Sequence, residues 1–203
     1  MDVFEVMRTT RAMRRLDPTR DIPEEDLWRV IEAATRAPSG GNTQPVRWLV
    51  VREAEPKRAL AEIYQKCWAQ ARIGYASDPV VAKSAMLRSA DYLAEHFADA
   101  PAVILPCARN AAAASVFPGI QNLMLAARAL DIGTTLTTVH IEREAEVKEV
   151  LGIPDDVRTY ALIPMGYPLG RWGEAPRRPV SEVTYWNSWK RHRERPEAIP
   201  TSS

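Results

Sequence analysis

A loop rich in hydrogen-bonding side chains, residues 37–45, is the stretch of this sequence best suited to holding a ligand. It reads Ala-Pro-Ser-Gly-Gly-Asn-Thr-Gln-Pro, and its two glycines can reach backbone angles that other residues avoid. The polar side chains between its prolines are Ser39, Asn42, Thr43 and Gln44. Together they offer donors and acceptors that can follow the polar edge of a flat heterocycle. The same residue types also fill plain helix-to-strand connections, so the loop alone leaves both interpretations open.

A cluster of arginines precedes this loop, at Arg11, Arg14 and Arg15. A guanidinium is always charged and can hold two phosphate oxygens at once, so such a cluster suits the phosphate tail of a cofactor. The alternative is a solvated basic surface, which charged clusters often form.

Taken together, residues 10–16 (Thr-Arg-Ala-Met-Arg-Arg-Leu) and the loop resemble the nitroreductase family of FMN-dependent oxidoreductases. Members of that family often open with Arg-Arg-Ser-x-Arg-x-Phe and carry a Pro-Ser-Gly-x-Asn-x-Gln-Pro-Trp loop after a helix. The order and spacing agree over most of the chain. Three departures are Thr10 in place of Arg or His, Ala12 in place of Ser, and Val46 in place of Trp.

The resemblance implies FMN as the cofactor and NADH or NADPH as the electron donor. It implies the following cofactor-binding residues: Arg11, Ala12, Met13, Arg14, Pro38, Ser39, Gly40, Asn42, Gln44, Leu136, Thr137, Thr138 and Arg177. Arg11, Arg14 and Arg177 match positions that contact the flavin or its phosphate. For residues 134–138, the alternative is that the threonines are buried and form hydrogen bonds with the backbone. In the family, the region equivalent to 68–83 often lies over the flavin, which makes Trp68 and Tyr75 candidates for a substrate lid. The alternative, which the sequence supports equally, is that this region is an irregular packed connection.

The elements that must position these residues follow from periodicity and from helix end signals. Helices are predicted over 2–8, 23–37, 56–72, 85–98, 115–131 and 142–151, and strands over 47–52, 102–107, 133–139 and 160–165. Residues 68–83 lose the helical period and are predicted to be irregular. Helix 115–131, with Ser115 as its N-cap, is apolar nearly all round and is therefore expected to be buried on most sides.

The amino-acid composition is typical of a globular protein. The chain has 203 residues, 46% apolar and 26% charged, which is enough for one sizeable domain. We expect one domain over 1–190 and a disordered tail over 191–203. A net charge of +1 argues against nucleic-acid binding, and no run is apolar enough to span a membrane. Two distant cysteines and the absence of a signal-peptide pattern predict a cytoplasmic protein.

No catalytic cluster can be assembled from side chains. His96, His140 and His192 are scattered, and neither a Ser-His-Asp set nor a set of metal ligands has suitable spacing. The prediction is therefore no catalytic residue and no metal, since a flavin carries the chemistry itself.

The resemblance implies an α+β, three-layer fold in which a mainly antiparallel central sheet is flanked by helices. It also implies a homodimer with composite active sites. The implied reaction is ping-pong hydride transfer from NAD(P)H, through FMN, to nitroaromatics, quinones or similar acceptors. Two alternatives stay open: a reductive dehalogenase of the iodotyrosine deiodinase type, and a flavin-binding or storage protein without useful turnover. A basic-arm interaction module is disfavoured by the near-neutral charge.

Overall fold

The computed structural model describes residues 1–109 and 112–194 of the chain. The chain divides into two units, Met1–Gly173 and a second unit that begins at Glu174. The predicted site residues except Arg177 belong to the first unit. The prediction of one domain over 1–190 remains a prediction.

A small antiparallel sheet forms the centre of the first unit. Its strands are β1 (Arg47–Val51), β2 (Ala102–Ala108), β3 (Gly133–Thr134), β4 (Arg158–Thr159) and β5 (Ile163–Gly166). The order is β1-β2-β5-β3, with β4 also paired to β2. All four pairings are antiparallel, and in the longest one Leu49 lies opposite Leu105. The predicted antiparallel sheet is thus confirmed.

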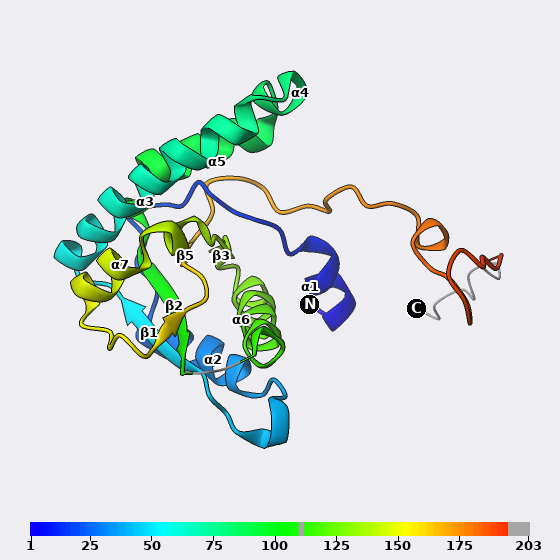
Figure 1. Ribbon diagram of the computed structural model, residues 1–203, viewed down its shortest axis with the longest axis horizontal. Coiled ribbons are helices and arrows are strands. Elements are labelled where there is room, and N and C mark those ends of the chain that lie inside the picture. The colour runs from blue at the N-terminus through cyan, green and yellow to red at the C-terminus, as the bar shows by residue number, and fades with distance from the viewer. Residues whose placement is uncertain (110–111, 195–203) are drawn as a thin grey trace. The chain divides into compact units, whose positions relative to one another are not determined.

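Helices surround this sheet. They are α1 (Val3–Thr9), α2 (Glu24–Thr35), α3 (Ala54–Ala76), α4 (Pro79–Ala82), α5 (Ala85–Glu95), α6 (Phe117–Ala129) and α7 (Glu144–Leu151). Short 3₁₀ turns are η1 (Gly40–Asn42), η2 (Phe97–Asp99), η3 (Ala113–Ser115), η4 (Val139–Arg143) and, in the second unit, η5 (Val180–Glu182). Figure 1 shows α3 and α5 side by side, with α4 at their far end.

The alternation of side chains along β2 divides the core into two layers. Val103, Leu105 and Cys107 belong to a cluster with residues of α3, α5 and α7. Ala102, Ile104 and Ala108 belong to a second cluster with residues of α2 and α6. Because successive side chains of a strand point to opposite faces, both faces of the sheet are covered by helices. The predicted three-layer α+β fold is confirmed.

Two local predictions about helices are wrong. The stretch 68–83 is not irregular, since α3 continues without a break to Ala76 and α4 follows at Pro79. Trp68 and Arg72 in this stretch both donate to Asp91 of α5, and these tertiary bonds outweigh the weak local pattern around Gly74. Ser115 is not the N-cap of α6, which begins at Phe117 after Val116; its hydroxyl has another partner, given below.

The second unit holds a local cluster of aromatic and basic side chains. The Tyr185 ring lies edge-on to Trp189 and to His192, with centroids 4.8 Å apart in both pairs. The Arg193 guanidinium lies 4.7 Å from the centroid of the Trp186 ring. Most of the predicted disordered tail, residues 195–203, lies outside the described residues. Over the part of the chain that the structure describes, no helix is long and apolar enough to cross a membrane.

Candidate active site

The first of two candidate ligand regions is a cavity of about 170 Å³ between helices and the segment that follows β3, which we call the arginine cavity. It is lined by Arg14, Tyr64, Trp68, Tyr75, Met86, Ala90, Thr135, Leu136, Thr137, Thr138 and Val139. The lining therefore combines aromatic and apolar side chains with hydroxyls and one guanidinium. Six residues predicted from the sequence meet here, although they come from three distant segments of the chain: Arg14, Trp68, Tyr75, Leu136, Thr137 and Thr138.

Backbone pairing fixes the position of the arginine segment. The Met13 backbone N–H donates to the Thr134 carbonyl at 2.9 Å, and the Thr135 hydroxyl donates to the Met13 carbonyl at 2.8 Å. This close approach requires Gly133, because a Cβ there would lie 2.8 Å from the Cβ of Met13. Met13 itself is buried in the core, so it holds the segment in place and leaves its neighbour Arg14 to face the cavity.

Arg14 is a half-buried cation without a carboxylate partner among the described residues. Its Nη1 donates to the Ser89 hydroxyl over a long 3.4 Å. Burial lowers the pKa of this guanidinium, while the neighbouring Tyr64 and Tyr75 oppose that change. Arg11 is exposed, and Arg15 stacks over the Tyr92 ring at 4.6 Å. A desolvated guanidinium that faces a cavity without a counter-charge favours an anionic ligand.

Three aromatic residues of α3, namely Tyr64, Trp68 and Tyr75, form an aromatic wall of the cavity. Tyr64 is buried and stacks on Phe97, with ring centroids 4.5 Å apart. Burial raises the pKa of the Tyr64 phenol, and a hydrogen bond with Thr137 together with the charge of Arg14 opposes that rise. The rings of Trp68 and Tyr75 are stacked at 5.8 Å. At neutral pH the wall therefore offers flat apolar surface and a protonated phenol.

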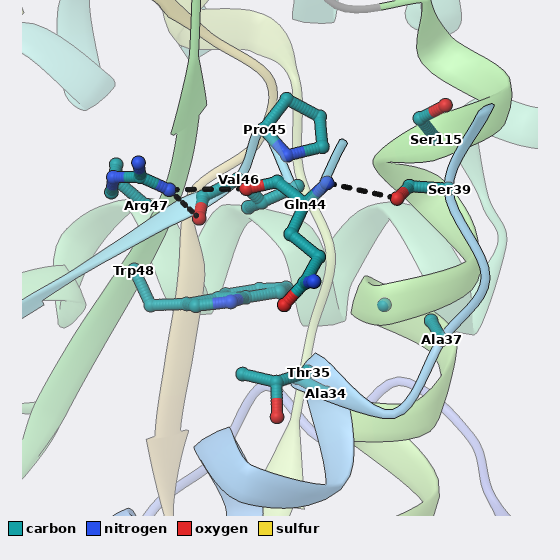
Figure 2. Close-up of a pocket in the computed structure, with 11 residues that line it drawn as sticks. Ala34, Thr35, Ala37, Ser39, Gln44, Pro45, Val46, Arg47, Trp48 and Ser115 are labelled. Atoms are coloured by element: carbon teal, nitrogen blue, oxygen red, sulfur yellow. Dashed lines mark hydrogen bonds between the residues drawn. The ribbon is translucent and has the colours of Figure 1, made fainter. Parts of the chain in front are cut away.

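The second region, the loop pocket, has a volume of about 200 Å³ and lies beside the loop of residues 37–45 (Figure 2). Its lining residues are Ala34, Thr35, Ala37, Ser39, Gln44, Pro45, Val46, Arg47, Trp48, Ser115 and Gly119. The loop is strained: Gly41, Asn42 and Gln44 have φ of 57°, 53° and 47°. Left-handed angles at residues other than glycine cost energy and concentrate at functional sites.

Hydrogen bonds compensate for this strain and fix the shape of the loop. The Gln44 N–H donates to the Ser39 hydroxyl at 3.0 Å, as Figure 2 shows. The Gly40 N–H donates to the hydroxyl of Ser115 at 3.1 Å, and this bond ties the loop to the residues just before α6. Arg47 donates to the carbonyls of Gln44 and Val46, each at 3.1 Å. The loop is thus held in one conformation by residues on both sides of it.

The family pattern has a tryptophan at the position of Val46. In this chain, Trp48 fills volume near that position. Its indole lies along the floor of the loop pocket (Figure 2). A Cβ added to Gly119 of α6 would lie 3.0 Å from Cζ2 of this indole, so the ring and the helix pack against each other. Val46 and Trp48 both pack on the cluster under α2 and α6.

The predicted site residues therefore fall into separate groups. Arg14 and five other predicted residues line the arginine cavity, whereas Ser39 and Gln44 line the loop pocket, and the two linings share no residue. Ala12 pairs with Thr134 beside the cavity. Pro38, Gly40 and Asn42 are exposed on the loop. Arg177 is an exposed residue of the second unit, and its Nη1 donates to the Pro176 carbonyl at 3.0 Å.

Sequence reasoning missed several residues of these regions. Tyr64, Thr135, Met86, Ala90 and Val139 line the arginine cavity, and Ser115 supports the loop. Tyr64 could have been found, because it lies one helical turn before Trp68 on the same face of a predicted helix. Ser115 lies 75 residues from its partner Gly40 and gives no local signal.

Comparison with known proteins supports one family. The family model for the Nitroreductase family matches residues 7–167. The chain belongs to the nitroreductase family.

The chain is also similar to individual relatives and to solved structures. It is 30% identical over 165 residues to a protein of Archaeoglobus fulgidus named as a candidate NADH dehydrogenase/NAD(P)H nitroreductase, with 78% of this chain and 82% of that protein covered. It is 28% identical to an iodotyrosine deiodinase of Thermotoga neapolitana, with 88% and 94% covered. The structure of an iodotyrosine deiodinase bound to FMN and 3-iodo-L-tyrosine superposes with a TM-score of 0.75 at 22% identity, covering 93% and 100%.

Membership of the nitroreductase family confirms the resemblance read from residues 10–16 and 38–45. The structural neighbour, at its low identity, supports the fold alone. Neither comparison tests the individual site residues, which remain predictions.

Proposed function

We propose that this chain transfers hydride from NADH or NADPH, through FMN, to nitroaromatics, quinones or similar acceptors. The observation that carries the proposal is Arg14, a half-buried guanidinium that has no carboxylate partner in the described chain and faces a cavity of aromatic rings and hydroxyls. Family membership gives the reaction class: an NAD(P)H-dependent flavin oxidoreductase with FMN as its cofactor.

The residues present fit FMN. Arg14 and the nearby exposed Arg11 can neutralise a phosphate, and Arg177 of the second unit is proposed as a third cation. Leu136, Thr137 and Thr138 border the same cavity and can follow the polar edge of a flat ring. When bound, FMN accepts a hydride from the nicotinamide and passes two electrons to the acceptor.

The chain's own groups orient the reactants and hold protons. Tyr64 keeps its phenolic proton at neutral pH because burial raises its pKa, so it can donate a hydrogen bond into the cavity. Trp68 and Tyr75 offer faces on which an aromatic acceptor can stack.

A homodimer with composite sites explains why the predicted residues form two groups. The arginine cavity and the loop pocket share no lining residue, so in the proposed dimer the loop of one chain completes the cavity of its partner. Outward-facing apolar residues of α1 support a partner surface, since Val3, Phe4 and Met7 are 55%, 72% and 53% exposed. A two-fold axis would then produce two equivalent sites.

Reductive dehalogenation of a halogenated phenol is the second candidate. The Thermotoga neapolitana deiodinase is similar over 88% of this chain, and the arginine cavity pairs a cation with aromatic walls. The two activities differ in their acceptor, so assays with a nitroaromatic and with 3-iodotyrosine under argon separate them.

The purified protein provides the decisive test. We expect a yellow protein with one FMN per chain, bleached by NADH or NADPH under argon and recoloured by a quinone or nitroaromatic. Double-reciprocal plots at several acceptor concentrations should be parallel, because both substrates are proposed to use one open face of the flavin. Bound flavin that neither nucleotide bleaches would favour the storage alternative, and a colourless protein would contradict the proposal.

A further inference from the structure

Asp91 of α5 is a carboxylate that does not line the arginine cavity but is bonded to one of its walls. Its Oδ1 accepts from the Trp68 indole Nε1–H at 2.9 Å. The same oxygen accepts from Arg72 Nε at 2.7 Å, and Oδ2 accepts from Arg72 Nη2 at 3.2 Å. One carboxylate thus joins α5 to two residues of α3 that lie one helical turn apart.

The indole bond restricts how Trp68 can lie. Trp68 is only 7% exposed, and a buried indole N–H that loses its acceptor pays a desolvation penalty. The plane of the ring is therefore fixed at one end by Asp91 and along its face by the stacked Tyr75 ring. A rotation of the indole toward or away from the cavity would break the bond to Asp91.

The charge on Asp91 strengthens this restraint. Hydrogen bonds from Arg72 and Trp68 hold the pKa of the carboxyl below its usual range, so it is ionised at neutral pH. A hydrogen bond to an ionised acceptor is stronger than a neutral one. Arg72 balances the charge, and the pair presents no net charge to the cavity beyond that of Arg14.

The position of Trp68 matters because its indole lines the arginine cavity together with Tyr64 and Tyr75. A shift of the indole changes the flat apolar surface on which an aromatic acceptor can stack.

We propose that Asp91 is a positioning residue that, through the indole of Trp68, sets which aromatic acceptors the arginine cavity favours. This inference rests on the proposed function, because it concerns acceptors of that same site. Asp91 itself touches neither acceptor nor cofactor.

Three variants separate the indole bond from the ion pair. Asp91→Ala removes both. Trp68→Phe removes only the indole N–H and keeps an aromatic ring. Arg72→Gln is the matched control, because it removes the ion pair and leaves an acceptor for Trp68.

Selectivity is measured as the ratio of kcat/KM for 1,4-benzoquinone to that for 1,4-naphthoquinone, two acceptors of the same chemistry that differ by one ring. We expect Asp91→Ala to change this ratio about tenfold, the scale of one lost hydrogen bond to a charged group. Arg72→Gln should leave it within about twofold. The double variant Trp68→Phe/Asp91→Ala should resemble Trp68→Phe alone, because Asp91 acts through the indole.

A second measurement needs no activity. In ¹⁵N spectra of tryptophan-labelled protein, the indole signal absent from Trp68→Phe is that of Trp68. Its hydrogen should exchange slowly in the wild type and in Arg72→Gln, and faster in Asp91→Ala.

The inference would be overturned if Asp91→Ala altered the Trp68 signal but left the kcat/KM ratio unchanged. It would also be overturned if the effects of Trp68→Phe and Asp91→Ala on the ratio were fully additive in the double variant. If Asp91→Ala fails to fold, Trp68→Phe, which keeps the ion pair, decides in its place, and an unchanged ratio there counts against the inference. A colourless or unbleached protein would defeat the proposed function instead, while the indole signal still reports the link between Asp91 and Trp68.

Discussion

At the residue scale, His140 shows how packing can make one protonation state dominate. Its side chain is fully buried, and its Nε2 lies 3.0 Å from the Thr159 hydroxyl. That hydroxyl donates to Glu144 Oε1 at 3.0 Å, so Nε2 carries the imidazole proton. Within residues 1–109 and 112–194, the buried Nδ1 has no hydrogen-bond partner and no acceptor for a proton. Burial accordingly lowers the pKa of His140 to about 4, although Glu144 opposes the change.

This predicts a stability that depends on pH. Between pH 6.5 and about 4 the unfolded chain binds a proton at His140 that the folded protein excludes. The free energy of unfolding should therefore fall as pH drops through this window, by roughly 3 kcal/mol from this residue, and its contribution should be constant above pH 6.5. His140→Gln should unfold with a shallower pH dependence in urea titrations between pH 4 and 6.5. Equal slopes for wild type and variant would contradict the assignment.

At the element scale, the loop of residues 37–45 depends on a residue outside it. Ser115 accepts from the Gly40 N–H, and the loop contains three left-handed residues that no local sequence pattern would hold in place. A strained loop that is fixed before binding loses less conformational entropy when a ligand arrives.

Removing that support should weaken flavin binding. We expect Ser115→Ala to raise the dissociation constant of FMN for the apoprotein about three- to tenfold, the scale of one neutral hydrogen bond. Quenching of flavin fluorescence on titration measures it, and the Gly40 amide should exchange its hydrogen faster. Ser115→Thr keeps a hydroxyl and serves as the control. Equal affinity in wild type and Ser115→Ala would show that the loop holds its shape unaided.

At the scale of the whole molecule, the prediction is a homodimer whose sites draw on both chains. The test uses two variants: Arg11→Glu, damaged in the arginine segment, and Ser39→Trp, damaged in the loop. Each homodimer should be inactive. Mixed dimers should hold one intact and one doubly damaged site, so random pairing leaves roughly one quarter of all sites intact.

Co-expression with mass spectrometry of the products measures this complementation. Zero activity in a sample that contains confirmed mixed dimers would place both elements in one chain. A monomer by light scattering would end the proposal.

The sequence by itself indicated most of the elements and the family. Prolines 23 and 38 bound the predicted helix that became α2, and β-branched runs predicted strands that the structure contains. The arginine and loop motifs carried the resemblance that the family match confirmed. These features are local, because periodicity, helix ends and motif spacing act over a few residues.

Only the tertiary structure decided which residues meet. The Thr135 hydroxyl bonds the Met13 carbonyl across 122 residues of sequence, Ser115 bonds Gly40 across 75, and Asp91 reaches Trp68 across 23. Bonds from Trp68 and Arg72 to Asp91 of α5 hold α3 where its own helical pattern is weak, so the stretch predicted to be irregular is helical. Which residues become partners depends on the burial of both core layers together, and no single segment of sequence determines that burial.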